Sequence, residues 1–297
     1  MSLRTWGVLS LGLSLAACAN PVDDQGYVDD QAPQGGAVAP APVKGGYNGN
    51  VATDMPSDNL GGGGGAGGGS TGSGGGSGAE PPTQPEPGLS AYYDFDSTSG
   101  YVFDVSGFGN HGTPTPTGVS FTAPGRSGQA ATFTGGHGSI VITSSPSLDF
   151  TVGASIEFWV RLSSVSSGTI LSRGWGDNAV RVRTTQGNIQ VVFSRASGGS
   201  AILTSSANTL GTAWSHVAVV NDGAELKLYL NGKLDSSVVG GNMGAVVSNL
   251  VIGKNENTDT AFNGTLDELK WWGVARTPAE ICVDAGGTLS GASCSLP

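Results

Sequence analysis

The pattern of apolar and polar positions changes near residue 89. From there on, the chain consists of short segments in which apolar and polar side chains alternate, separated by turn residues. Alternation with a period of two is typical of a strand with one buried face and one face in water. The segments with this pattern are residues 91–95, 155–161, 179–183, 188–195, 214–220, 225–230, 249–252 and 262–272.

Turn and cap signals complete this pattern. Residues 221–223 (Asn-Asp-Gly) and 231–232 (Asn-Gly) resemble short hairpin loops. One helix is predicted at residues 277–283, with Thr277 as N-cap, Pro278 at its first position and Glu280 completing a capping box. About ten short strands and one short C-terminal helix predict an all-β fold, an antiparallel two-sheet jelly-roll sandwich.

Residues 18–88 have a different composition. They contain acidic residues, prolines and a segment, residues 61–78, in which 13 of 18 positions are Gly. Such a segment cannot bury enough apolar surface to offset the entropy lost on ordering, which predicts a long disordered tether. The predicted organisation is a signal peptide (residues 1–17), the linker (18–88), the folded domain (89–283) and a C-terminal tail (284–297).

Cys18 follows a short apolar segment close to the N-terminus. Arg4 precedes residues 6–15, which are mostly apolar, and two alanines stand directly before Cys18, as before a signal-peptide cleavage site. The segment is shorter than the roughly 20 residues that span a bilayer. The pattern resembles the lipobox of bacterial lipoproteins, in which this cysteine carries lipid. We therefore expect lipidation of Cys18 and a membrane anchor that does not cross the bilayer. An ordinary signal peptide with a chance cysteine is the alternative.

The residue after Cys18 bears on the location. It is Ala19 and not the Asp that tends to retain the lipoproteins of enteric bacteria at the inner membrane. This resemblance implies an exported outer-membrane lipoprotein that faces the periplasm or the cell surface. A formal net charge of −10 argues against nucleic acid as a partner, because contact with phosphates requires a basic face.

The other two cysteines, Cys282 and Cys294, lie near the C-terminus. In an exported protein, two such cysteines are most simply explained by a disulfide, which would pin the tail. A metal site is the weaker alternative, because two cysteines without a nearby histidine supply at most half of a zinc site.

The folded region resembles the laminin-G-like jelly rolls of the concanavalin A-like lectin/glucanase superfamily. The resemblance covers about residues 89–282 and depends on the order of several blocks. These are residues 93–96, 104–112, 128–135, 155–161, 214–218, 228–232, 262–269 and 275–281. One departure is Thr134, which stands where the family commonly has Asp. The resemblance implies a concanavalin A-like sandwich, but the family includes carbohydrate-binding modules, adhesion modules and, further away, glycoside hydrolases.

A catalytic function is not expected. The related glucanases carry closely spaced carboxylates on one strand, whereas Glu157 and Glu225 each stand alone in their predicted strands. Asp267 and Glu268 are adjacent, so regular alternation would place them on opposite faces. No nucleophile-elbow motif is present that would indicate a Ser/His/Asp triad. Carboxylates distant in sequence could still converge, so a glycoside hydrolase with a cryptic site stays an alternative.

Calcium is the one cofactor that the resemblance suggests. Asp104, Asn110 and Asp267 resemble positions at which related jelly rolls hold a structural Ca²⁺, an ion that takes six to eight oxygen ligands. The alternative is that these side chains shape turns through hydrogen bonds to the backbone.

A local excess of arginine marks a candidate binding face. Between residues 161 and 195 there are five Arg and one acidic residue. Arg181 and Arg183 alternate with valines and would project from one face, while Arg173 and Trp175 are expected in the preceding loop. Guanidinium groups suit carboxylate, sulfate or phosphate groups on a polymer, and an exposed Trp could stack on a sugar. The alternative is an ordinary solvated sheet face.

These observations predict a lipid-anchored surface protein with a non-catalytic binding module for a glycan or another extracellular polymer. A module for protein–protein adhesion or envelope assembly, binding through its loops, is the main alternative.

Overall fold

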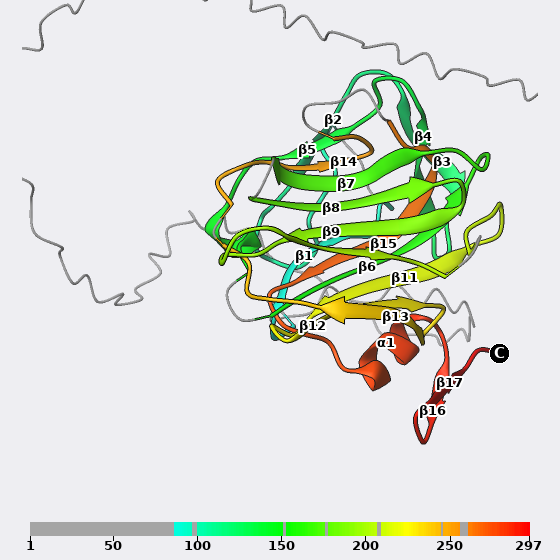
Figure 1. Ribbon diagram of the computed structural model, residues 1–297. Coiled ribbons are helices and arrows are strands. Elements are labelled where there is room, and N and C mark those ends of the chain that lie inside the picture. The colour runs from blue at the N-terminus through cyan, green and yellow to red at the C-terminus, as the bar shows by residue number, and fades with distance from the viewer. Residues whose placement is uncertain are drawn as a thin grey trace, which may run out of the picture. The chain divides into compact units, whose positions relative to one another are not determined.

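The structure is a computed structural model that describes residues 86–96, 100–150, 153–175, 178–206, 209–244, 246–255 and 261–297. These residues form two antiparallel sheets, one α-helix and a small C-terminal hairpin (Figure 1). The predicted signal peptide, Cys18 and the predicted linker up to residue 85 lie outside the described residues. The predicted all-β sandwich is confirmed.

One sheet has eight strands. They are β1 (Leu89–Tyr93), β3 (Val119–Pro124), β4 (Gln129–Thr134), β6 (Ala154–Leu162), β11 (Ser215–Asn221), β12 (Glu225–Leu230), β13 (Lys233–Val239) and β15 (Asn263–Trp272). Seven of them follow the order β13-β12-β11-β6-β15-β4-β3, and β1 pairs with β15 beyond the part of β15 that pairs with β4.

The other sheet has seven strands. They are β2 (Gly112–Pro114), β5 (Ile140–Ile142), β7 (Gly168–Trp175), β8 (Asn178–Thr185), β9 (Asn188–Ser194), β10 (Ser200–Thr204) and β14 (Leu250–Ile252). Their order is β10-β9-β8-β7-β14-β5-β2. In Figure 1 this sheet lies in front, with β7, β8 and β9 toward the viewer and β6 and β15 behind them.

The core lies between the two sheets and uses the alternation seen in the sequence. Ile156, Phe158 and Val160 of β6 are fully buried, as are Val180 and Val182 of β8. A short 3₁₀ helix, Pro146–Leu148, and the residues after it close one part of this core. There, aromatic rings stack: the centroid of Phe150 lies 4.6 Å from that of Trp271, and the Trp271 indole N–H donates to the carbonyl of Leu148.

Strand β15 contains a bulge. Its pairing with β6 shifts between Asp267 and Lys270, and Glu268 has a φ of 52°, in the left-handed region. The extra residue lets both acidic side chains lie on the outer side of the sheet, while Leu266 and Leu269 on either side are buried in the core. The expectation that Asp267 and Glu268 lie on opposite faces was therefore wrong, because regular alternation does not hold across a bulge.

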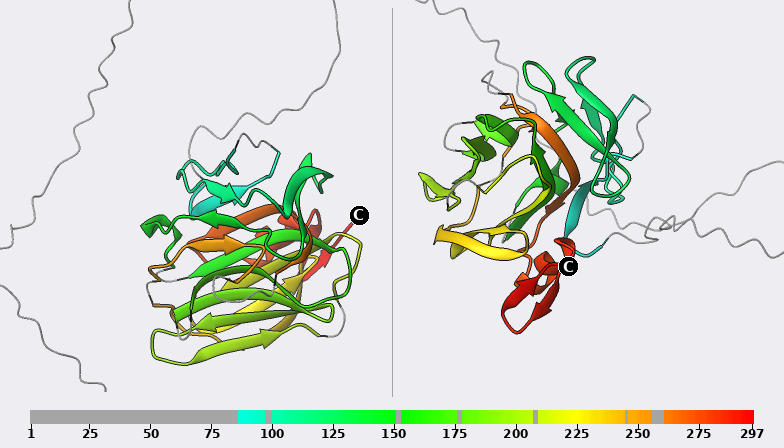
Figure 2. Two further views of the ribbon diagram at one scale, coloured as in Figure 1. Left: turned by 90° about the horizontal axis from the view of Figure 1, so that it is seen from above. Right: turned by 90° about the vertical axis from the view of Figure 1, so that its right-hand side faces the viewer.

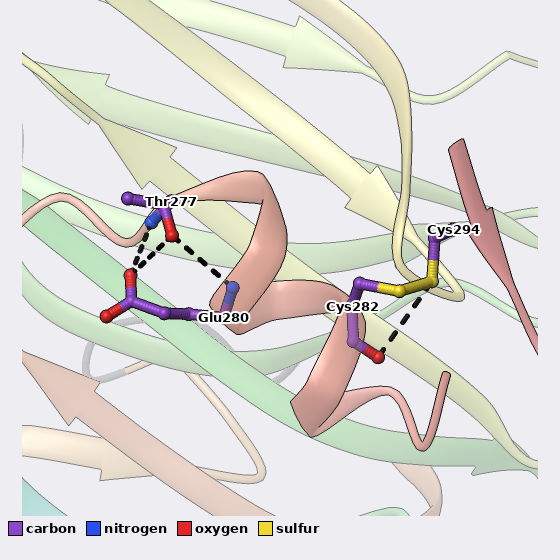
Figure 3. The surroundings of a disulfide bond; sticks show 4 residues. All are labelled: Thr277, Glu280, Cys282 and Cys294. Carbon is purple, nitrogen blue, oxygen red and sulfur yellow. Dashed lines mark hydrogen bonds between the residues drawn. A yellow bond between two sulfur atoms is a disulfide. The ribbon is translucent and has the colours of Figure 1, made fainter. Parts of the chain in front are cut away.

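The C-terminal region begins with helix α1 (Pro278–Asp284), which packs beside β13 and the tail hairpin of β16 (Thr288–Ser290) and β17 (Ser293–Ser295). The views in Figure 2 show this hairpin in red at the end of the domain. Thr277 caps the helix, and Thr277 and Glu280 form the predicted capping box (Figure 3). Cys282 and Cys294 form the predicted disulfide, which joins α1 to β17 (Figure 3).

Candidate functional site

Arg181 and Arg183 lie side by side on the outer face of the seven-stranded sheet. Both belong to β8, and the valines that alternate with them are fully buried in the core. Arg183 is exposed, and its Nε donates to the side-chain oxygen of Gln190 on β9 at 2.8 Å. The structure therefore places these two arginines as the sequence predicts.

Among the described residues, the Arg181 guanidinium has no acidic partner, and its buried Nε has no hydrogen-bond acceptor. Partial burial, and then the like charge of Arg183, lower the pKa of Arg181. The described residues provide no ion pair to either arginine. Two cations held close together without a counterion favour an anionic ligand, which would relieve their mutual repulsion.

Arg173 does not belong to this face, which corrects the sequence interpretation. Its side chain is buried, since Arg173 pairs with the inward-facing Val180. The guanidinium donates to the carbonyls of Leu148 and Ser248, and it forms an ion pair of 2.7 Å with Asp149. Arg173 therefore joins β7 to two loops and is not available to a ligand.

Trp175 is the last residue of β7 and pairs with Asn178 at the β7–β8 turn. The position of its side chain lies outside what the structure describes, so its predicted contact with a sugar stays a prediction.

Asp104 and Asn110 come together in one loop, where they bond to backbone groups. The Asp104 carboxylate accepts hydrogen bonds from the N–H groups of Tyr92, Ser106 and Asn110 at 2.9–3.0 Å. The Asn110 amide donates to the Ser90 carbonyl and to the Ser147 hydroxyl. The three N–H donors at the Asp104 carboxylate are the bonds that the turn-shaping alternative expects.

Asp267 makes its contacts at a different turn. One of its carboxylate oxygens accepts from the N–H groups of Arg126 and Ser127, in the turn between β3 and β4. Burial raises the pKa of Asp267 to about 7. In the described part of the chain, no group of three His, Cys, Asp or Glu side chains could hold a metal ion. Calcium binding stays a hypothesis that chelation can test.

A cluster of ionisable groups on the outer face of the eight-stranded sheet was not predicted from the sequence. The cluster contains Glu157, Glu268, Lys270 and Asp284, the last residue of α1. The Tyr92 hydroxyl donates to Glu268 at 2.6 Å, and Asp284 accepts from Lys270 at 2.8 Å. A shallow pocket of ≈ 330 Å³ opens beside Glu268 and Asp284. Glu268 and Asp284 are thus held by donors of the protein itself, which is typical of a structural network.

A second missed feature is a polar hollow of ≈ 400 Å³ beside the loop that Asp104 shapes. Tyr101 and Phe108 border it, and both rings are exposed. The available signal was the presence of two aromatic residues in a loop rich in Gly, Ser and Asn.

A larger hollow of ≈ 770 Å³ lies between the β12–β13 hairpin, α1 and the tail hairpin. Among the described residues that line it, Lys233 is the only charged one, and the other walls come largely from Leu234, Pro278, Leu289 and neighbouring small residues. None of the helices in the described residues has the length and apolar character needed to cross a membrane.

Comparisons with known proteins agree with this fold. The Laminin_G_3 family, described as belonging to the concanavalin A-like lectin/glucanases superfamily, matches residues 134–282. None of the curated proteins compared with the sequence matches it.

Solved structures with the same fold include binding domains of toxins. The botulinum neurotoxin serotype G binding domain has a TM-score of 0.56 and 18% identity, covering 67% of this chain and 50% of the other. The binding domain of Paraclostridial Mosquitocidal Protein 1 has a TM-score of 0.57 and 16% identity, covering 67% and 52%. The receptor binding domain of botulinum neurotoxin D has a TM-score of 0.55 and 16% identity, and the match covers 67% of this chain and 52% of the other.

The chain thus spans about half the length of these solved structures, and at such low identity the likeness concerns the fold alone. The family match covers half of the sequence and includes most strands of both sheets. This chain belongs to the Laminin_G_3 family of the concanavalin A-like lectin/glucanases superfamily.

Proposed function

We propose that the protein is a lipid-anchored, non-catalytic binding module for an anionic glycan or another anionic extracellular polymer. The observation that carries the proposal is the pair of arginines on β8, whose side chains lie on one open sheet face without an acidic partner among the described residues. Carboxylate or sulfate groups along a polymer would satisfy both guanidinium groups.

The fold supports a binding role, since the structural neighbours named above are binding domains. The contacts of the described carboxylates support a non-catalytic one. Asp104, Asp267 and Glu268 each accept hydrogen bonds from groups of the protein, and Asp284 pairs with Lys270 and Arg276. Such contacts are typical of carboxylates that hold elements of a fold together.

The anchor would act together with this surface. Lipid on Cys18 and a tether of residues 18–88 would keep the domain near the membrane and raise its local concentration at a surface polymer, so a weak site would suffice. Labelling of expressing cells with an alkyne fatty acid tests the anchor. The wild-type chain should incorporate the label and partition into detergent, while Cys18→Ser should do neither. Equal labelling of both would refute the anchor.

Binding of the full-length protein to polygalacturonate, dextran sulfate and uncharged dextran tests the arginine face. Arg181→Ala/Arg183→Ala should weaken binding to the two polyanions at least tenfold and leave any binding to dextran unchanged. Added salt should weaken polyanion binding of the wild type, because salt screens exposed charges.

Two further variants sharpen this test. Arg126→Ala/Lys233→Ala removes the same charge from exposed positions elsewhere and should bind nearly as the wild type does. Arg181→Lys/Arg183→Lys keeps the charge but loses the planar fork, so intermediate affinity is expected. Unchanged polyanion binding of the alanine variant would rule out this face. Failure of the wild type to bind either polyanion would favour the protein-partner alternative.

A further inference from the structure

Tyr101 and Phe108 are unusual among the aromatic residues of the domain. Tyr101 and Phe108 are 55% and 51% exposed, whereas every other Phe, Tyr or Trp whose burial is described is buried or half-buried. Burying an aromatic ring is favourable because it removes apolar surface from water, so an exposed ring forgoes that free energy. Two such rings at the border of one hollow are therefore a feature that calls for a ligand.

The hollow between these rings is polar but uncharged. Besides the two aromatic residues it is lined by residues 109–111, Thr113 and residues 143–145, and no Asp, Glu, Lys or Arg of the described part of the chain lines it. Its volume of ≈ 400 Å³ lies within the range of about 300–1,000 Å³ that is typical of small-molecule sites. Hydroxyl groups can both donate and accept hydrogen bonds, which matches a ligand with many hydroxyls of its own.

The loop that presents Phe108 is held by hydrogen bonds of its own residues. The Phe108 N–H donates to the Ser106 hydroxyl, and the Ser106 N–H donates to Asp104. The far wall is tied to the same loop, because the Ser147 hydroxyl lies within hydrogen-bond distance of both the Asn110 side chain and the Ser145 hydroxyl. Both walls of the hollow are thus fixed relative to each other before any ligand arrives, which lowers the entropy lost on binding.

His111 offers one oriented donor. Its Nδ1 accepts a hydrogen bond of 3.0 Å from the Asp104 N–H, so Nδ1 carries no hydrogen. In the neutral imidazole the hydrogen then lies on Nε2, which is a donor. The Asp104 loop therefore sets the tautomer of a residue that lines the hollow.

We propose that this hollow binds a ring of a neutral saccharide. The apolar C–H groups of a sugar ring would pack on both Tyr101 and Phe108, and its hydroxyls would bond to the threonine, serine and His111 groups. A charged ligand would find no counter-charge in the lining. The site is separate from the arginine face: β2 and β8 are four strands apart in the same sheet, about 19 Å at the usual strand spacing.

Binding of the full-length protein to uncharged oligosaccharides tests this proposal. The probes are gluco-, galacto-, manno- and xylo-hexasaccharides, with saturation-transfer NMR and titration calorimetry as readouts. At least one should bind, and both Tyr101→Ala and Phe108→Ala should weaken it at least tenfold. Tyr101→Phe keeps the ring and should retain most of the affinity. Val165→Ala, at an exposed apolar position elsewhere, should not change it.

The result distinguishes this site from the arginine face. Arg181→Ala/Arg183→Ala should leave hexasaccharide binding unchanged, even if that variant shows the arginine face to be inactive. The proposal is overturned if none of the four hexasaccharides binds at millimolar concentration. It is also overturned if the Tyr101→Ala and Phe108→Ala proteins melt as the wild type does and bind with wild-type affinity, or if these variants lose only the binding of polyanions or of a peptide.

Discussion

Nε2 of His216 lies 3.6 Å from a carboxylate oxygen of Glu157, and both side chains are buried on the outer side of the eight-stranded sheet. Burial raises the pKa of Glu157 to about 7, with a further contribution from Asp284, and burial lowers the pKa of His216 to about 4. His216 is therefore neutral at neutral pH, and the contact is not an ion pair under those conditions.

The two shifts act on stability with opposite signs. The raised pKa of Glu157 contributes stability that is present below about pH 4.5 and is lost as the pH rises through about 7. The lowered pKa of His216 contributes stability that is present above about pH 6.5 and is lost as the pH falls through about 4. Between pH 4.5 and 6.5 the two dependences offset each other in the wild type.

Single variants should expose each dependence. Relative to the wild type, the free energy of unfolding of Glu157→Gln should increase as the pH rises from 4.5 to 7. That of His216→Gln should decrease from pH 4 to 6.5. Urea unfolding at four pH values between 4.5 and 7.5 measures both differences. Asp267 and other groups titrate in the variant as in the wild type, so their contributions cancel when the two free energies are subtracted. A difference that does not vary with pH would contradict the assignment for that residue.

Loss of the disulfide should destabilise the protein and free its tail. Cys282→Ser/Cys294→Ser should lower the free energy of unfolding by about 2–3 kcal/mol, since the bridge closes a short loop. Hydrogen exchange should also show faster exchange of the amides of β16 and β17. Thr277→Ala is the matched control: losing the helix cap should cost about 1 kcal/mol and leave β17 attached. Unchanged exchange in the tail of the cysteine variant would contradict this role.

Asp104 should matter for stability without a metal. Asp104→Ala leaves three N–H groups without their acceptor and should lower the free energy of unfolding by at least about 2 kcal/mol. Addition of EDTA to the wild type should not change its melting temperature. A melting temperature that falls in EDTA and recovers on addition of Ca²⁺ would instead support the calcium hypothesis.

Arg173 should also be structural. Arg173→Met removes a buried guanidinium that bonds to Leu148, Ser248 and Asp149, so the free energy of unfolding should fall by about 3 kcal/mol or more. The exposed Arg183→Ala should change it by no more than about 0.5 kcal/mol. Denaturant unfolding of both variants measures the contrast. Equal stability of the two variants would show that the buried contacts of Arg173 contribute little.

The elements that were predictable from the sequence are those whose characteristic residues lie close together in the chain. The strands around Phe158 and Val182 were recognisable because each buried side chain is followed by a neighbour outside the core. Helix α1 was recognisable because Thr277, Pro278 and Glu280 form its cap within four residues. The disulfide followed from the number of cysteines and their place near the tail.

The features that were missed depend on residues far apart in the chain. The burial of Arg173 was not predictable, because its partners Asp149 and Ser248 lie 24 and 75 residues away in the chain. The bulge at Glu268 gives no sign in the alternation pattern. The hollow at Phe108 was missed because one wall comes from residues 143–145, which only the pairing of β2 with β5 brings close.

The pairing of β15 has a consequence for the order of events during folding. β15 lies between β6 on one side and β1 and β4 on the other, yet it is the last long strand of the chain. While the ribosome has not yet released residues 263–272, these three strands lack the neighbour that joins them, and such distant pairing is slow to form. The eight-stranded sheet thus stays divided, with β6, β11, β12 and β13 on one side of the gap and β3 and β4 on the other, until synthesis of the domain is almost complete.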